Sequence, residues 1–157
     1  MRKFFIIFMI AVLFPISFSN YSFGVELVKK LIELGSCPKC DLSGADLIAA
    51  HLKRADLNGA NLSRANLSGV NFAEAKFTNA DLSNANLASA NLNEAQLGGA
   101  NLRRADLSSA SLKLAYLYRA DLSGANLSGA NFSGADLRYV NLKWADLRGA
   151  KFIETDI

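Results

Sequence analysis

Residues 40–54 read CDLSG, ADLIA and AHLKR, three five-residue units that each have leucine at the centre. The register continues without a slip, so every fifth residue from Leu42 to Ile157 is Leu, Phe or Ile. This gives twenty-four units, of which the last is truncated. The residue two places before each centre is Ala, and the exceptions are Cys40, Val70, Val140 and Thr155.

Neither a helix nor a flat strand explains a period of five. In an α-helix a five-residue step moves each leucine by about 140° around the axis, so no apolar stripe forms. In a strand an odd period sends successive leucines to opposite faces. The pattern instead predicts a short extended piece and a bend in every unit, with Ala and Leu pointing inward. Such units bury an apolar face only by stacking on their neighbours.

The repeat resembles the pentapeptide-repeat family, whose consensus is Ala-(Asp/Asn)-Leu-x-x. Residues 60–64 (ANLSR) and 125–129 (ANLSG) match this consensus directly, and the resemblance covers residues 40–157. The family implies an all-β fold, a right-handed quadrilateral β-helix with four pentapeptides per coil. On that basis we expect about six coils, stacked at the β-strand spacing of about 4.8 Å. We expect Phe132 and Phe152 to stack in the core.

The N-terminus has the marks of a secretory signal peptide. Arg2 and Lys3 precede an apolar run over residues 4–14, which is shorter than the roughly twenty residues that span a bilayer. We predict a signal peptide over residues 1–19, with cleavage after Ser19, or after Gly24 as the alternative. An uncleaved membrane anchor is the competing interpretation. Neither junction carries a Cys for lipid attachment, so we expect export to a periplasm or secretion, with no stable membrane anchor.

Residues 20–39 are expected to close the first coil. Apolar residues at 27, 28, 31, 32 and 34 have helical spacing, and Gly35 is a natural stop, so the sequence predicts a short N-terminal capping α-helix over residues 25–35. An uncovered solenoid end exposes apolar side chains and unpaired strand groups, which such a helix covers. A helix that binds a membrane or a partner is the functional alternative.

Cys37 and Cys40 are the only cysteines of the chain. An even cysteine count in an exported protein favours a disulfide, here one that joins the cap to the first coil. Thioredoxin-type redox chemistry needs this motif at the start of a helix in a βαβ unit, and zinc needs four ligands where only His51 could add to the two thiols. Free thiols are the remaining alternative.

The rest of the chain offers no recognised catalytic constellation, and we expect neither an enzyme nor a cofactor. The only histidine, His51, is predicted to face solvent. Each Asp of the repeats precedes a repeat centre, where Asp and Asn side chains bond to nearby backbone at turns. On one face Asp and Asn alternate from coil to coil, which keeps like charges about 10 Å apart.

Most outward positions carry Ser, Asn, Gly or Ala, but one region carries aromatic and basic residues instead. With twenty residues per coil, Tyr118 is predicted to stack on Arg138, and Arg119 on Tyr139. Arg, Tyr and Trp dominate binding hot spots, so this aromatic–basic patch is predicted to bind a partner, either a protein or a glycan. Mutual shielding of neighbouring coils is the alternative. The patch comprises Arg104, Tyr116, Tyr118, Arg119, Arg138, Tyr139, Lys143 and Trp144.

The chain therefore reads as a non-enzymatic, exported structural scaffold or protein-interaction module. Some cytoplasmic family members imitate DNA and bind DNA gyrase, which is the alternative function. That mimicry needs a strongly acidic surface, whereas the net charge is +3, or +1 after loss of Arg2 and Lys3 with the signal peptide. We expect no nucleic-acid partner. An end-to-end homodimer through the C-terminal coil would cover Phe152, Ile153 and Ile157.

Overall fold

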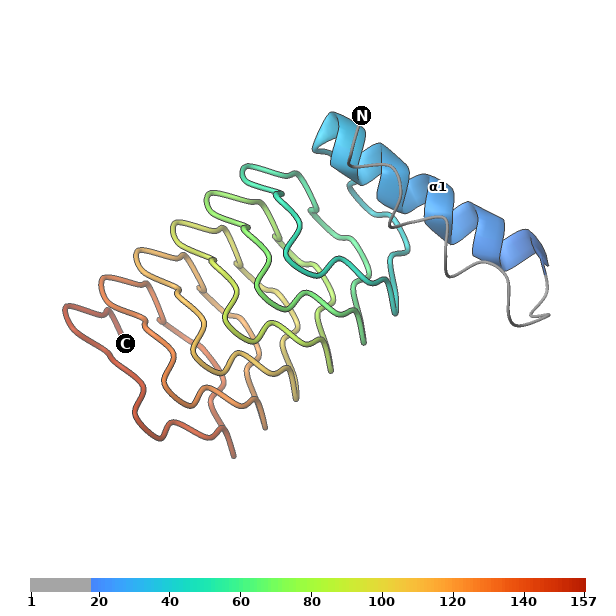
Figure 1. Cartoon of the computed structure of the whole chain (residues 1–157). Helices are drawn as coiled ribbons and strands as arrows, with labels where there is room; N and C mark the ends of the chain where they lie inside the picture. The colour runs from blue at the N-terminus through green and yellow to red at the C-terminus, as the bar shows by residue number, and fades with distance from the viewer. Residues whose placement is uncertain (1–17) are drawn as a thin grey trace.

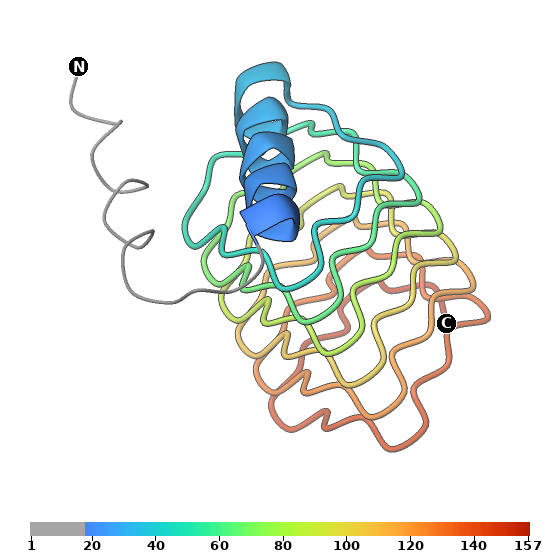
Figure 2. The same cartoon turned by 90° about the vertical axis from the view of Figure 1, so that its right-hand side faces the viewer.

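A computed structural model describes the chain from residue 18 to residue 157, and the side chains from residue 25 onward. One α-helix, α1 (Phe18–Leu34), precedes a stack of coils that continues to the C-terminus. In Figures 1 and 2 α1 lies across the N-terminal end of this stack. The predicted apolar run of the signal peptide, residues 4–14, falls outside the described residues.

Each coil pairs with the next through single parallel bridges between residues twenty apart. Asp41 pairs with Asn61, and Asn61 pairs in turn with Asp81. The amide of each repeat centre up to Leu137 extends the ladder, as when Leu62 N donates to the Asp81 carbonyl at 2.7 Å. Four pentapeptides therefore complete one circuit, as the family resemblance implies for a quadrilateral β-helix. The strand character is limited to these short bridges.

A tight turn follows every repeat centre. Ala45 N donates to the Leu42 carbonyl at 3.0 Å, which places Ser43 and Gly44 at the first and second turn positions. Gly44 has a φ of 67°, as the third residue of a type II turn requires. Within residues 18–157, sixteen non-glycine residues also have positive φ, and all occupy the second turn position. Arg119, Tyr139 and Trp144 are among them, so these side chains project from the corners of the coils.

The core is a column of leucine and alanine, in which nearly every repeat centre up to Leu137 is buried. Phe132 and Phe152 stack with their ring centroids 5.3 Å apart, which confirms the expected contact. The last coil has no following coil within the described chain, and its apolar residues are more exposed. Leu147 is 39% exposed, and Ile157 is 84% exposed.

Helix α1 begins earlier than the predicted residue 25, because no proline stops it and Gly24 alone does not break a helix. Gly35 ends it as predicted, with a φ of 64° and a 2.8 Å bond from its amide to the Leu31 carbonyl. Leu31 is fully buried against the first coil, with Leu27 and Val28 beside it. Ile32 and Leu34, expected on the same apolar face, are exposed instead. Among residues 18–157 no helix is long and apolar enough to cross a membrane.

The coil ladder starts before the first repeat that the sequence pattern reveals. Ser36 bridges to Asp56, and Cys37 N donates to the Asp56 carbonyl at 2.8 Å. Cys37 is fully buried and takes the place of a repeat centre in line with Leu57. The pattern conceals this unit because a cysteine stands where leucine is expected. The Cys37–Cys40 disulfide is present, and it spans the first turn of the first coil.

Candidate partner-binding surface

Tyr118 is the centre of the aromatic–basic patch. Its ring stacks on that of Tyr116, with centroids 6.1 Å apart and planes 15° from parallel. Tyr139, one coil further on, meets the Tyr118 ring edge-on at 5.3 Å. The guanidinium carbons of Arg119 and Arg138 lie 5.1 Å and 5.9 Å from the Tyr118 ring centroid. These five residues form one group, which we name the Tyr118 cluster.

The arrangement within the cluster differs in part from the prediction. The expected contact of Arg138 with Tyr118 is present. Arg119, expected on Tyr139, instead lies over Tyr118, its neighbour in the same coil. Because Arg119 and Tyr139 both sit at second turn positions, their side chains leave the corners in directions that the repeat period does not fix.

The other patch residues lie apart from the Tyr118 cluster, one corner further around the coil. Lys143 Nζ is 4.1 Å from the Trp144 ring centroid, which forms a separate cation–π pair. Arg104 occupies the same corner two coils earlier, and its Cγ packs over Gly124 in the intervening coil. Within residues 25–157 no aromatic or cation–π contact joins this corner to the Tyr118 cluster.

The cationic side chains of the patch are not equivalent. Arg138 makes a two-pronged contact with Asp136, through Nε to Oδ1 at 2.9 Å and Nη2 to Oδ2 at 2.7 Å. The hydrogen bonds from Arg138 lower the pKa of the Asp136 carboxyl. The Asp136 carboxylate in turn largely neutralises the positive charge of Arg138. Arg104, Arg119 and Lys143 form no ion pair within the described part of the chain. Their charges remain available to an anionic group from outside.

A small hollow of about 230 Å³ lies beside the Tyr118 cluster. Its floor is the backbone of Gly98 and Gly99, and Tyr116 leans over it. A Cβ atom at Gly98 would lie only 3.0 Å from Tyr116 Cε1. Sequence reasoning missed this hollow. The available signal was Gly98 itself, because it forms the only Gly-Gly pair of the chain. The hollow is lined by Thr78, Asn79, Gly98, Gly99, Tyr116, Tyr118 and Arg119.

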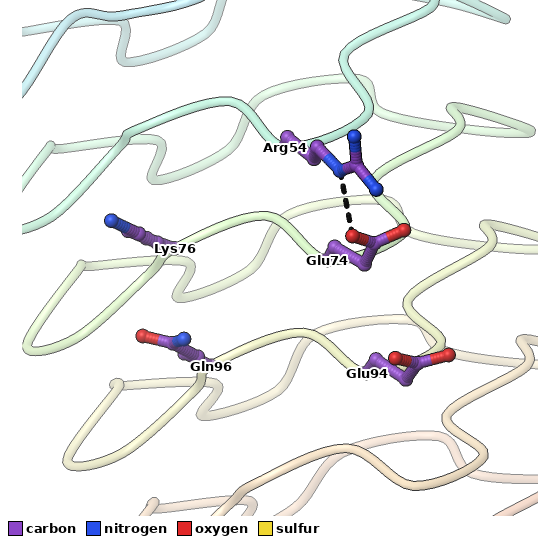
Figure 3. Close-up of a pocket in the computed structure, with 5 residues that line it drawn as sticks. All are labelled: Arg54, Glu74, Lys76, Glu94 and Gln96. Atoms are coloured by element: carbon purple, nitrogen blue, oxygen red, sulfur yellow. Dashed lines mark hydrogen bonds and ion pairs between the residues drawn. The ribbon is translucent and has the colours of Figure 1, made fainter.

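A second, larger hollow of about 480 Å³ lies on another corner and is lined by four charged residues and Gln96 (Figure 3). Arg54 Nε donates to Glu74 Oε2 at 2.6 Å, and Lys53 Nζ lies 2.9 Å from Glu74 Oε1. The hydrogen bonds from Arg54 and Lys53 lower the pKa of Glu74 from its ordinary value to about 2. Glu94, the next residue in this column, forms no ion pair within residues 25–157. The close ion pairs are those expected of a surface that links adjacent coils.

The pentapeptide-repeat family model matches residues 40–79, 80–117 and 115–152 in eight copies. No curated protein matches the chain. Among solved structures, the chain is similar to the pentapeptide repeat protein Rfr23 of the cyanobacterium Cyanothece 51142. The two are 29% identical, the match covers 84% of this chain and 97% of that one, and the TM-score is 0.53.

Two further solved structures extend the comparison. A pentapeptide repeat protein of the Arabidopsis thaliana thylakoid lumen is 34% identical over 66% of this chain and 70% of its own, with a TM-score of 0.50. QnrB1, a plasmid-mediated fluoroquinolone resistance protein, is 24% identical over 68% of this chain and 56% of its own, with a TM-score of 0.45. The repeat, the coil geometry and the match to the family model show that the chain belongs to the pentapeptide-repeat family.

Proposed function

We propose that the protein is an exported, non-enzymatic scaffold, a rod of about six coils capped by α1, whose Tyr118 cluster binds a protein or glycan partner. The observation that carries the proposal is the concentration of contacts on Tyr118, which touches two tyrosine rings and two guanidinium groups. Binding hot spots are enriched in these residue types and cluster in this way.

The exposure of the patch favours binding over shielding of neighbouring coils. Tyr139 is 76% exposed and Trp144 is 80% exposed, so most of both rings contributes nothing to the core. Both residues also hold a positive φ, a conformation that costs a non-glycine residue about 1 kcal/mol or more. Glycine occupies the same turn position in many repeats without that cost. Large aromatic side chains at these corners therefore support a role outside the fold.

Export is supported by the sequence of residues 1–19 and by the Cys37–Cys40 disulfide, since disulfides persist in oxidising compartments. Both candidate cleavage points, Ser19 and Gly24, lie within α1. Cleavage at either point leaves residues 25–34, which include Leu31 and the other residues that pack on the first coil.

The gyrase-binding alternative is less favoured. The likeness to QnrB1 concerns the fold alone, and mimicry of DNA needs a row of negative charges. The side of the rod that carries the Tyr118 cluster instead presents the unpaired Arg119, and the neighbouring corner presents Arg104 and Lys143. For these reasons we propose no nucleic-acid partner.

The proposal is tested by replacing Tyr118, Tyr139 and Trp144 together with Ser in the exported protein. Partner capture from the same compartment and thermal stability are measured in parallel. A matched control replaces the exposed Ile48 and Arg64, which lie outside the patch, with Ser. We expect capture to be lost only in the patch variant, with little change in melting temperature. Unchanged capture with reduced stability would show that the aromatic cluster serves the fold alone.

We also propose that two copies associate end to end through the C-terminal coil. Ile153 is 63% exposed and Ile157 is 84% exposed, next to the partly buried Leu142 and Phe152. Within the described chain, the backbone N–H groups of Leu142, Leu147 and Phe152 have no ladder partner. Association would cover both the apolar side chains and these donors.

A further inference from the structure

We propose that the hollow beside Tyr116 binds one sugar ring of an acidic glycan. This inference rests on the proposed function, since it names the ligand class of the same surface. The hollow, here called the Tyr116 hollow, is the 230 Å³ space between Tyr116, Tyr118 and Arg119 on one coil and Thr78 and Asn79 two coils earlier. It is smaller than the roughly 300–1,000 Å³ of sites for drug-sized ligands, so it suits a single ring.

The shape of the hollow depends on Gly98. The first turn position of this face is glycine only here, and the other coils carry Pro38, Asn58, Thr78, Tyr118 and Arg138. Gly98 has no positive φ, so its backbone does not require glycine. What glycine provides is space, because a Cβ atom would crowd the Tyr116 ring. The missing side chain at Gly98 therefore lets the Tyr116 ring lie close over a backbone conformation that any residue could adopt.

The walls combine aromatic and polar groups. Tyr116 is 44% exposed, and its ring leans over the backbone of Gly98. Aromatic rings of this kind can pack against the carbon–hydrogen face of a sugar. Thr78 and Asn79 supply a hydroxyl and an amide on the opposite side, which can exchange hydrogen bonds with sugar hydroxyls. Mostly apolar walls with a few placed polar groups are typical of small-ligand sites.

Charge selects an acidic ligand. Arg119 lines the hollow and has no ion-pair partner within residues 25–157, whereas the nearby Arg138 is matched by Asp136. A uronic-type sugar carries a flat carbon–hydrogen face, hydroxyls and a carboxylate on one six-membered ring. No peptide side chain combines these three features. The aromatic wall, the polar rim and the guanidinium of Arg119 match them within one hollow.

The test measures binding of the full exported protein to a trimer of galacturonic acid, with a neutral galactose trimer and a triglutamate peptide as comparison probes. Gly98→Ala places a Cβ atom against the Tyr116 ring, and so should displace this wall of the hollow, at a backbone conformation that alanine accepts. Arg119→Gln removes its free charge. Arg64→Gln is the matched control, because Arg64 lies outside the patch but also occupies a second turn position with positive φ and forms no ion pair within residues 25–157. Melting temperature is recorded for every variant.

We expect the acidic trimer to bind more tightly than either comparison probe. Arg119→Gln should weaken this binding about tenfold or more, in line with a lost charge-assisted hydrogen bond. Gly98→Ala should weaken it similarly, and Arg64→Gln should leave it unchanged. Equal or tighter binding of the neutral trimer or of triglutamate overturns the inference, as does full binding by Gly98→Ala or no detectable binding of the acidic trimer.

The same measurements separate this inference from the proposed function. If triglutamate binds, and Tyr118→Ser abolishes that binding while Gly98→Ala does not, the Tyr118 cluster is a binding surface but the sugar assignment is wrong. If the acidic trimer binds equally to the native protein and to the Tyr118, Tyr139 and Trp144 triple Ser variant, both are wrong.

Discussion

Asn101 Nδ2 donates a 3.0 Å hydrogen bond to Oδ1 of Asp81, its bridge partner twenty residues earlier. The same bond joins Asn61 to Asp41 at 3.0 Å and Asn141 to Asp121 at 3.1 Å. Along this face each carboxylate therefore has an amide, and not another carboxylate, as its neighbour. The alternation of Asp and Asn is a ladder of charge-assisted hydrogen bonds between coils.

Replacing Asn101 with Asp should break this ladder. The substitution removes a donor to Asp81 and places a third carboxylate between Asp81 and Asp121, so we expect a loss of about 1–2 kcal/mol at neutral pH. Asn91→Asp is the control, since its bridge partners Asn71 and Ser111 carry no charge. Equal loss in both variants, by denaturant unfolding, would contradict a charge effect.

The repeat period predicts a chain that coils around a core of Leu and Ala, and the family resemblance adds four pentapeptides, or twenty residues, per coil. Once residues twenty apart are neighbours, Asp81 must meet Asn101, whatever the side-chain rotamers are. The start of the ladder was not predictable, because Cys37 fills a centre where the pattern shows no leucine. The length of α1 was underestimated, because the apolar spacing begins only near residue 25 while nothing just before it stops a helix.

The candidate site was predictable as a composition but not as a geometry. The period places Tyr118 beside Arg138, and this contact is present. It does not say which way Arg119 turns, since a long side chain at a corner has several open directions. It also cannot show that Gly98 leaves a hollow under Tyr116, because this depends on how the Tyr116 ring leans toward the preceding coil.

Acid should weaken the link between Glu74 and its two cationic partners. The pKa of Glu74 is lowered from 4.5 to about 2 in the folded state, chiefly by the hydrogen bond from Arg54. Its contribution to stability is therefore present above pH 4.5 and lost as the pH falls toward 2. At pH 6 the native protein should have a slightly higher melting temperature than Glu74→Gln, and this difference should disappear near pH 2. A gap of the same size at both pH values, or a matching gap for Glu94→Gln, would count against this account.

Reducing the Cys37–Cys40 disulfide should loosen the N-terminal end of the rod. A closed loop of four residues restrains the unfolded chain by about 2 kcal/mol in the chain-entropy model. Coils contact only their neighbours, so the loss should stay local. Hydrogen exchange should accelerate in α1 and the first coil while the region around Leu97 stays protected. The Cys37→Ala/Cys40→Ala double variant should not respond to reductant, and uniform acceleration along the rod would contradict a local role.

Replacing Trp144 with glycine should stabilise the fold. Trp144 has a φ of 61° and is 80% exposed, with Lys143 as its aromatic-face contact. Trp144→Gly removes the cost of the left-handed conformation. Glycine also gives the unfolded chain more conformational freedom, and once this cost is subtracted we expect the free energy of unfolding to rise by about 0.5–1 kcal/mol. Tyr139→Gly gains the same relief but loses the edge contact with Tyr118, worth about 0.5–1.5 kcal/mol, so its net change should lie near zero or below. Clear destabilisation by Trp144→Gly in thermal melts would assign this side chain to the fold.

Apolar residues of the last coil should control self-association. Ile153 occupies a first turn position there and is 63% exposed, next to Phe152 in the thinly covered end of the core. Ile153→Glu places a charge where a second copy would pack, which is costly unless the charge finds a partner. Ile48→Glu is the matched control, because Ile48 is 56% exposed at a first turn position near the opposite end of the rod. Light scattering over a range of concentrations should show dimers of the native protein and of Ile48→Glu but monomers of Ile153→Glu. A native protein that stays monomeric at high concentration excludes the proposed contact, and equal dimerisation of all three places the interface elsewhere.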